Sequence, residues 1–140
     1  MAKTILIVDD SSSVRQQVSK ALTGAGFKVA EAADGQEGLA MVGSNRDIDM
    51  VICDVNMPVM DGIEMVEKVK RAPENKSLPI LMLTTEGQVS LVRQARKAGA
   101  VGWIVKPFQH LQLLQTVYHL TRRLDGPSEG VTSEPTERVV

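Results

Sequence analysis

The chain has 140 residues, of which 43% are hydrophobic and 24% are charged, and its formal net charge is −1. This composition predicts one globular domain with enough apolar side chains to bury a core. The near-neutral charge gives no general attraction to nucleic acid or anionic lipid, and no apolar run approaches the roughly 20 residues of a membrane helix. No signal sequence precedes the first apolar run, so we expect a cytoplasmic monomer without nucleic-acid or membrane partners.

The N-terminal segment predicts a strand followed by a helix. Residues 4–8 are an apolar run, typical of a strand, that ends in Asp9 and Asp10. The serines at 11–13 can cap a helix whose apolar stripe stops at residues 24–26, where two glycines occur.

The next segment leads to the central strand. Residues 28–32 predict a short second strand, and Asp34 with Glu37 forms a capping pair that begins a second helix. The apolar run at residues 51–54 is followed by a loop that contains proline and glycine, which is typical of a strand buried on both faces. This strand delivers Asp54 to its C-terminal end.

The remaining elements repeat the alternation of strand and helix. Asp61 and Glu64 form a second capping pair that begins a helix, which Pro73 breaks. After it we expect a strand at 79–83, a helix through 91–95, a strand at 102–105 and a last helix that turns Leu111, Leu114, Val117 and Leu124 inward.

Five apolar strands alternating with five helices predict an α/β fold, with a parallel sheet covered by helices on both faces. The natural winding is the flavodoxin-like, doubly wound order 2-1-3-4-5, whose switch point lies between strands 1 and 3. This domain spans residues 1–124. Residues 125–140 carry four carboxylates and one arginine among few apolar groups, so we expect a flexible, disordered tail.

Three carboxylates are expected at the switch point, those of Asp9, Asp10 and Asp54. Like charges gathered at one edge repel one another and need a cation or a retained proton. A hard divalent ion fits, above all Mg²⁺, with Mn²⁺ as the other candidate. Helix capping is the alternative role for Asp10 alone, but Asp54 has no cap role of its own. The only cysteine, Cys53, lies in the central strand and is expected to be a buried hydrophobe.

Two further strand ends point to the same edge. Strand 4 ends in the hydroxyl of Thr84 and strand 5 in the ammonium of Lys106, which precedes a proline and suggests a cis Lys106–Pro107 bond. Each residue alone could be a helix cap or a surface charge. A carboxylate, a cation site, a hydroxyl donor and a fixed ammonium together are the groups needed to receive a phosphoryl group.

The combination resembles the response-regulator receiver domain, most of all the single-domain chemotaxis regulators of the CheY type. The resemblance rests on Asp9-Asp10, Asp54, the segment Asn56 to Gly62, Thr84, and the segment Lys106 to Phe108. It implies that Asp54 is the phospho-acceptor, that Asp10, Asp54 and the Asn56 carbonyl bind the metal, and that Asp9 holds metal-bound water. Thr84 and Lys106 would then hold the phosphoryl oxygens. A histidine kinase would be the donor, and the face made by helix 4, strand 5 and helix 5 would bind the target.

Four positions bear on the subtype. Asn56 and Glu86 match the pair that influences acyl-phosphate lifetime in CheY-type members. Thr85 stands where alanine is frequent, which predicts tighter access to the phosphoryl group. Trp103 stands where tyrosine is frequent, on the strand face opposite Lys106 and next to helices 4 and 5. Its ring can lie inward against Thr84 or outward in solvent, and we expect it to move between these places as part of the switch, whereas fixed packing is the alternative.

Three other functions compete with this one. A flavodoxin-like electron carrier would need a hydroxyl-rich or glycine-rich loop after strand 1, where this chain has two carboxylates. An aspartyl phosphatase would need an acid/base partner two residues after the nucleophile, where this chain has Asn56. A phosphorelay intermediate would pass the phosphoryl group on to a histidine phosphotransfer protein. In the receiver interpretation the chain is no enzyme beyond its own phosphorylation and dephosphorylation.

Overall fold

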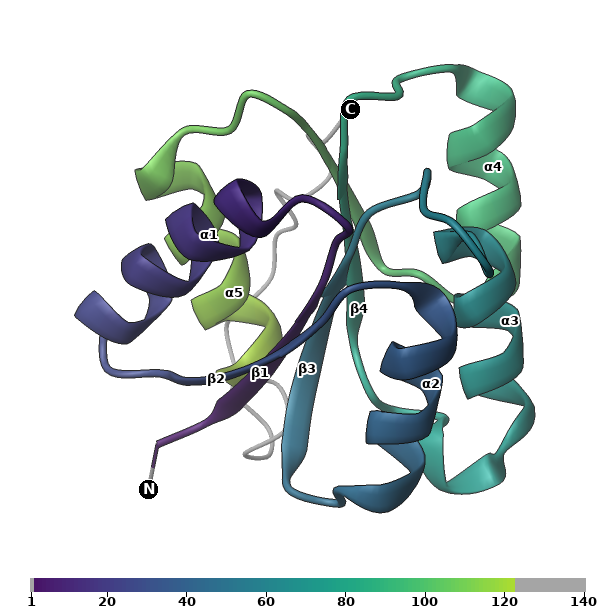
Figure 1. The fold of residues 1–140 in the computed structure, drawn as a ribbon, viewed down its shortest axis with the longest axis horizontal. Coiled ribbons are helices and arrows are strands. Elements are labelled where there is room, and N and C mark those ends of the chain that lie inside the picture. The colour runs from purple at the N-terminus through teal and green to yellow at the C-terminus, as the bar shows by residue number, and fades with distance from the viewer. Residues whose placement is uncertain (1, 123–140) are drawn as a thin grey trace.

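The structure is a computed structural model in which residues 2–122 are described (Figure 1). Its strands are β1 (Thr4–Val8), β2 (Lys28–Ala32), β3 (Ile48–Cys53), β4 (Ile80–Thr84) and β5 (Gly102–Val105). Its helices are α1 (Ser12–Gly24), α2 (Gly35–Ser44), α3 (Gly62–Arg71), α4 (Val89–Ala98) and α5 (His110–Arg122), with a short 3-10 turn at Pro73–Asn75.

The five strands form one parallel sheet in the order β2-β1-β3-β4-β5, which confirms the predicted winding. Helices α1 and α5 cover one face of the sheet, and α2, α3 and α4 cover the other (Figure 1). The direction in which successive strands are added to the sheet reverses between β1 and β3, so the loops after these two strands lead to opposite faces of the sheet and leave room for a ligand at the carboxyl ends of the strands.

Two apolar clusters, one on each face of the sheet, hold these layers together. Alternate side chains of the central strands enter opposite clusters, with Ile7 and Ile52 facing α1 and α5, and Val8 and Cys53 facing α2 and α3. This double burial explains why the central strands are almost continuously apolar in sequence.

Side-chain caps fix where three of the helices begin. The Ser11 side chain accepts a hydrogen bond from the Val14 amide at 3.3 Å, Asp34 accepts one from Glu37 at 2.8 Å, and Asp61 accepts one from Glu64 at 2.9 Å. Gly62, next to the last cap, is sterically required because a Cβ there would overlap the Asp54 carbonyl.

Some sequence predictions about these elements were wrong. Strand β3 begins at Ile48, three residues before the predicted start, because Asp49 accepts a hydrogen bond from the Thr4 amide at 2.8 Å and so fits into the sheet. Strand β4 starts one residue late and includes Thr84. In α5 the side chains of Leu113, Val117 and Leu120 are buried, whereas Leu111 is 67% exposed.

The reason for the error in α5 is that its apolar residues occupy more than one stripe. Leu113 and Val117 face the sheet and Leu114 is partly buried against the same cluster, whereas Leu111 faces solvent. Leu124 and the tail at 125–140 lie outside the described residues. None of the helices within residues 2–122 is long and apolar enough to cross a membrane.

Candidate functional site

Three carboxylates meet at the carboxyl edge of the sheet, as predicted. Strands β1 and β3 pair in register, with Val8 opposite Cys53, so the residues that follow them, Asp9 and Asp54, lie side by side. The Asp54 amide donates to the Val8 carbonyl at 2.9 Å. Ligand oxygens of Asp9, Asp10 and Asp54 all lie within 4.8 Å of one another. Asp9 and Asp54 are buried and Asp10 is exposed, so the group has one side open to solvent.

Lys106 brings a positive charge into this group. It follows β5, and its amide donates to the Thr84 carbonyl at 2.8 Å. Its ammonium lies 2.8 Å from Asp9 Oδ2 and 3.2 Å from Asp54 Oδ2. The Lys106–Pro107 bond is cis, as the sequence suggested. The predicted convergence of strands 1, 3 and 5 on one site is therefore confirmed.

Burial and ion pairing shift the pKa values of Asp9 and Lys106 in opposite directions. Burial raises the pKa of Asp9 above its usual value, although hydrogen bonds from Lys106 and the Ser11 amide pull it back. Burial alone would lower the pKa of Lys106, but its hydrogen bond to Asp9 and the charges of Asp54 and Asp9 outweigh this effect and raise it. The ammonium is thus held in its charged form beside two buried acids.

The donor set fits a hard divalent cation. The ammonium of Lys106 contacts two of the three carboxylates, those of Asp9 and Asp54, so the group keeps a net negative charge. Each of the three residues offers a carboxylate oxygen, the kind of ligand that Mg²⁺ prefers. Exposed Asp10 marks the side from which an ion can enter. Asp9, Asp10 and Asp54 can therefore hold a metal ion.

Cys53 is not a candidate nucleophile or metal ligand in this site. Its thiol is buried, 3.8 Å from the Met65 sulfur, and burial and then the charge of Asp54 raise the pKa of the thiol far above its usual range. It stays protonated and packs as a small apolar side chain, as expected.

The β4–α4 loop connects the site to its surroundings through Glu86. The Glu86 amide donates to the hydroxyl of Thr84 at 3.3 Å, and its carboxylate accepts from the Asn56 side chain at 2.7 Å. Thr84 itself is fully buried at the end of β4, whereas Thr85 is exposed. The predicted lifetime pair, Asn56 and Glu86, therefore forms a direct bridge between two loops beside the carboxylates.

Trp103 lies inside the protein. It is 2% exposed and its indole nitrogen donates to the Glu86 carbonyl at 2.8 Å. It shares a cluster with Met82 and with Ala95 of α4, but that cluster contains no residue of α5. The expected position beside both helices was wrong in this respect, because strand alternation turns Trp103 away from the face that α5 covers.

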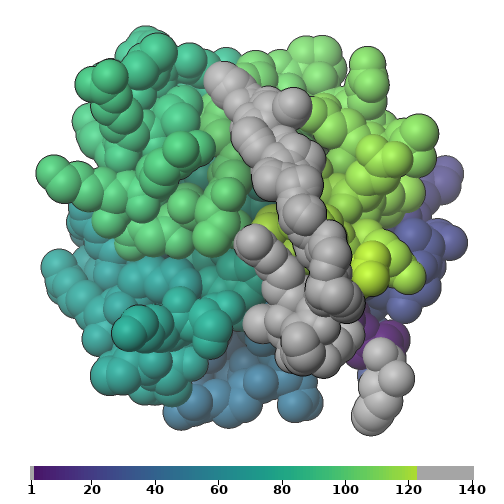
Figure 2. Space-filling model, turned by 180° about the vertical axis from the view of Figure 1, so that it is seen from behind, coloured from purple at the N-terminus to yellow at the C-terminus, as the bar shows by residue number. Residues whose placement is uncertain are grey.

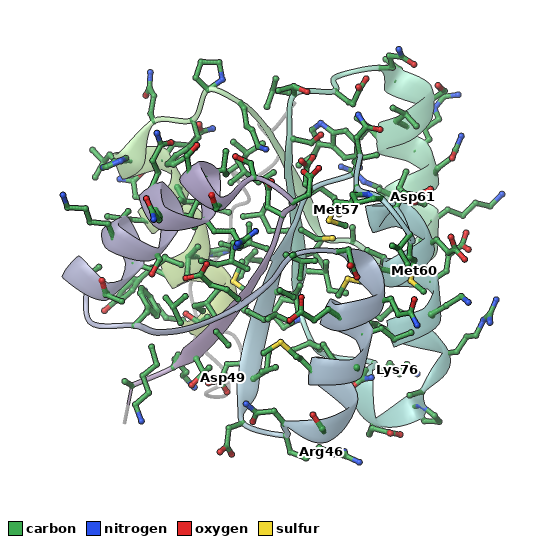
Figure 3. All side chains as sticks on the ribbon, viewed as in Figure 1. Arg46, Asp49, Met57, Met60, Asp61 and Lys76 are labelled. Atoms are coloured by element: carbon green, nitrogen blue, oxygen red, sulfur yellow. The ribbon has the colours of Figure 1, made fainter. Side chains whose placement is uncertain are left out.

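The loop after β3 also approaches the site. Figure 3 shows Met57, Met60 and Asp61 around the N-terminal end of α3, whereas Arg46 and Asp49 lie at the opposite end of β3. In this loop Val59 has a φ of 70°, and the Met60 amide donates to the Pro58 carbonyl at 2.7 Å. Asn56 belongs to the same loop.

Sequence reasoning missed three groups that fix the carboxylates. The Ser11 amide donates to Asp9 Oδ1 at 2.9 Å and the Val55 amide to Asp54 Oδ1 at 2.7 Å. The Arg15 guanidinium donates to the Asp9 backbone carbonyl at 2.6 Å. Hydrogen bonds from backbone amides cannot be predicted from residue types. In the sequence Arg15 is not distinguishable from an exposed helix residue, because its contact with Glu31 is apparent only in the fold.

The fold and site define a class: doubly wound α/β domains with a cluster of carboxylates and a lysine at the switch point. Residues 5–118 match the response regulator receiver domain family. The chain belongs to this family, a family of signalling proteins, and this membership favours a receiver domain over an electron carrier or an aspartyl phosphatase.

Relatives and solved structures support the subtype. The chain is 43% identical over 105 residues to a chemotaxis protein CheY homolog of Campylobacter jejuni, covering 74% of this chain and 81% of that protein. It is 40% identical over 121 residues to chemotaxis protein CheY-3 of Vibrio cholerae, covering 86% and 92%.

Among solved structures, CheY4 of Vibrio cholerae matches with a TM-score of 0.81 and 46% identity over 86% of this chain and 99% of that one. CheY of Borrelia burgdorferi, in complex with CheX, BeF3 and Mg²⁺, matches with a TM-score of 0.76 and 33% identity, covering 82% and 86%. The chain is therefore a receiver domain of the CheY type in two-component signalling, and its relatives support a role in chemotaxis.

Proposed function

We propose that Asp54 is the phosphoryl acceptor of this receiver domain. The observation that carries the proposal is the placement of Lys106, whose ammonium contacts both Asp54 and Asp9. Asp54 Oδ1 accepts a hydrogen bond from the Val55 amide and Oδ2 contacts Lys106, so the carboxylate is fixed in orientation at the rim of the sheet. A fixed carboxylate beside a fixed cation suits phosphoryl transfer, in which positioning and charge stabilisation dominate.

The chemistry of the step follows from these groups. An Asp54 carboxylate oxygen attacks the phosphorus of a phosphohistidine on a histidine kinase, the bond from phosphorus to the donor nitrogen breaks, and that nitrogen keeps the electron pair. Lys106 neutralises charge on a phosphoryl oxygen, and Thr84 would donate its hydroxyl to another. The Thr84 oxygen now accepts a hydrogen bond from the Glu86 amide at 3.3 Å, and movement of this side chain toward a phosphoryl group would lengthen that contact.

The metal ion would be held by Asp10, Asp54 and the Asn56 carbonyl, with Asp9 binding a metal-bound water. Mg²⁺, or Mn²⁺ in its place, would supply the positive charge that three carboxylates and a phosphoryl group together require. The fit of the three carboxylates supports this assignment. The Borrelia burgdorferi relative, which binds BeF3 and Mg²⁺ in its solved structure, supports it further.

Signal output would pass through the β4–α4 loop to the face made by α4, β5 and α5. Phosphorylation that draws Thr84 away from Glu86 would disturb the bond between the Glu86 carbonyl and Trp103, and with it the start of α4. Figure 2 shows the green surface that includes α4 and the yellow-green surface of α5 on the same side of the molecule. Val105, Leu111 and Tyr118 expose apolar surface there, which supports binding of a protein target after phosphorylation.

Acetyl phosphate provides a direct test without the kinase. Wild-type protein incubated with acetyl phosphate and Mg²⁺ should gain one phosphoryl group by intact mass spectrometry, and EDTA should prevent the gain. Asp54→Asn should remain unmodified, whereas Asp61→Asn, which changes an exposed acid on the neighbouring loop and keeps a good cap, should react normally. Modification of Asp54→Asn to the wild-type level would overturn the proposal.

A further inference from the structure

Arg15 of α1 binds the backbone of the acidic cluster rather than a side chain in it. Its Nη1 donates to the Asp9 carbonyl at 2.6 Å and its Nε to Glu31 Oε1 at 2.9 Å, so a single guanidinium connects β1, α1 and β2. The Arg15 side chain is only 18% exposed, and that of Glu31 is 41% exposed. The planar fork of arginine makes this two-sided contact possible, whereas the single ammonium of a lysine has no such fixed geometry.

The orientation of the Asp9 carbonyl affects the geometry of the acidic cluster. It lies just before Ser11, the N-cap of α1, and among the described residues its donor is Arg15 and not a helix amide. Because a peptide unit is planar, holding this oxygen fixes the orientation of the whole unit from Cα of Asp9 to Cα of Asp10. Arg15 therefore controls the backbone from which two of the three carboxylates project.

Asp10 depends on this control more than its neighbours do. Asp9 is held by the Ser11 amide and Lys106, and Asp54 by the Val55 amide and Lys106. Within residues 2–122, no hydrogen bond or ion pair reaches the exposed carboxylate of Asp10. Its position near the other two carboxylates is thus set by the backbone alone.

We propose that Arg15 is a positioning residue for the divalent-cation site, and that Glu31 holds its guanidinium in place. The inference rests on the proposed function, since it concerns the affinity of the same three carboxylates for Mg²⁺. Without Arg15 the peptide between Asp9 and Asp10 can rotate. Binding of the ion must then order this peptide, and the cost in conformational entropy reduces the affinity for Mg²⁺.

The direction in which Mg²⁺ affinity changes when Arg15 is replaced distinguishes a positioning role from a purely electrostatic one. Removing a positive charge beside an anionic cluster should strengthen binding of a cation if charge alone mattered. Loss of positioning should weaken it instead. The two roles of Arg15 thus predict opposite changes in Mg²⁺ affinity.

Isothermal titration of Mg²⁺ into the full chain tests the inference. Arg15→Met should raise the dissociation constant for Mg²⁺ by about ten-fold, as outer contacts of metal ligands typically do. Arg15→Lys, which keeps the charge, should weaken binding in the same direction, and Glu31→Gln should do so by a smaller factor. Arg93→Met, which removes an exposed arginine on α4, should leave the constant unchanged.

Thermal unfolding of each variant without metal shows whether it is folded at the temperature of the titration. If Arg15→Met fails to fold, Arg15→Lys, which leaves the charge unchanged, provides the test. Mg²⁺ affinity that is unchanged or tighter in the folded variants would overturn the inference while leaving the proposed function intact. Wild-type protein that binds no Mg²⁺ would instead contradict the proposed function, and with it the premise of the inference.

Discussion

Lys106 and Asp9 are 97 positions apart in the chain, yet the lysine Nζ lies 2.8 Å from Asp9 Oδ2. The contact spans two intervening strands of the sheet, because β1 and β5 are separated by β3 and β4. The same ammonium lies 3.2 Å from Asp54, so one cation serves two buried acids. The stability of the metal-free protein should therefore depend on the balance of charge at this point.

Removing Lys106 should destabilise the metal-free protein. In Lys106→Met the Asp9 side chain, which is 3% exposed, loses its cationic partner. Breaking a buried pair from one side typically costs about 3 kcal/mol of the free energy of unfolding. Urea unfolding at neutral pH in EDTA measures the change, with Lys97→Met on the exposed surface of α4 as the control. Equal midpoints for Lys106→Met and wild type would contradict the expectation.

Removing a carboxylate should have the opposite effect. Asp10→Asn and Asp54→Asn each relieve repulsion within the cluster and leave the Lys106 contact with Asp9 in place, so each should gain about 1 kcal/mol without metal. Saturating Mg²⁺ should reverse the order, because the wild type then binds the ion more tightly. Melting temperatures with EDTA and with Mg²⁺ test both statements. A lower melting temperature of both variants in EDTA would mean that these carboxylates stabilise the fold.

Asp9 should give the metal-free protein a stability that falls as the pH rises. Burial raises the folded-state pKa of Asp9 above 3.8, so the folded protein binds its proton more tightly than the unfolded chain does. Its contribution is fully present below pH 3.8 and is lost as the pH rises through the folded-state pKa. Urea unfolding in EDTA from pH 3.5 upward should show the free energy of wild type decreasing relative to Asp9→Asn. A difference that stays constant over this range would contradict the raised pKa of Asp9.

The sequence predicted that Asp9, Asp54 and Lys106 lie together, because each of them follows an apolar strand. Asp9 and Asp54 follow continuous apolar runs, and the winding rule for an odd number of parallel strands brings those ends together. Lys106 could be placed on the same edge for the same reason. The partners that fix the site could not be predicted, since Ser11 and Val55 act through backbone amides and Arg15 acts through a carbonyl.

It was harder to predict which apolar side chains are buried than to predict where the strands end. Several stripes of α5 are apolar, and only the tertiary structure decides that Leu113 is buried and Leu111 exposed. The place of Trp103 was open for a similar reason. Strand alternation fixes the face on which it lies, but not whether the indole reaches the Glu86 carbonyl.

Val59 should be replaceable by glycine with a gain in stability. Its φ of 70° is unfavourable for a β-branched residue, and the bond from the Met60 amide to the Pro58 carbonyl closes a strained three-residue turn around it. The side chain is 73% exposed, so little packing is lost. Val59→Gly should gain about 1 kcal/mol in urea unfolding, whereas Val101→Gly, at an exposed valine without positive φ, should lose about as much. Destabilisation of Val59→Gly by as much as Val101→Gly would show that the turn is not strained.

Trp103 should report phosphorylation through its emission. It is the only tryptophan, its ring is 2% exposed, and its indole nitrogen donates to the carbonyl of Glu86. The amide of the same residue is bonded to the Thr84 hydroxyl, so drawing that hydroxyl onto a phosphoryl group shifts the acceptor of the indole. The buried position of the ring is consistent both with fixed packing and with movement during the switch. The fluorescence emission of Trp103 distinguishes these two alternatives. Beryllofluoride with Mg²⁺ should change the intensity or wavelength of the emission in wild type, and Asp54→Asn should abolish the change. Mg²⁺ alone is the control for effects of the metal. An unchanged spectrum when beryllofluoride binding is confirmed by fluorine NMR would show that Trp103 only fills space between the sheet and α4.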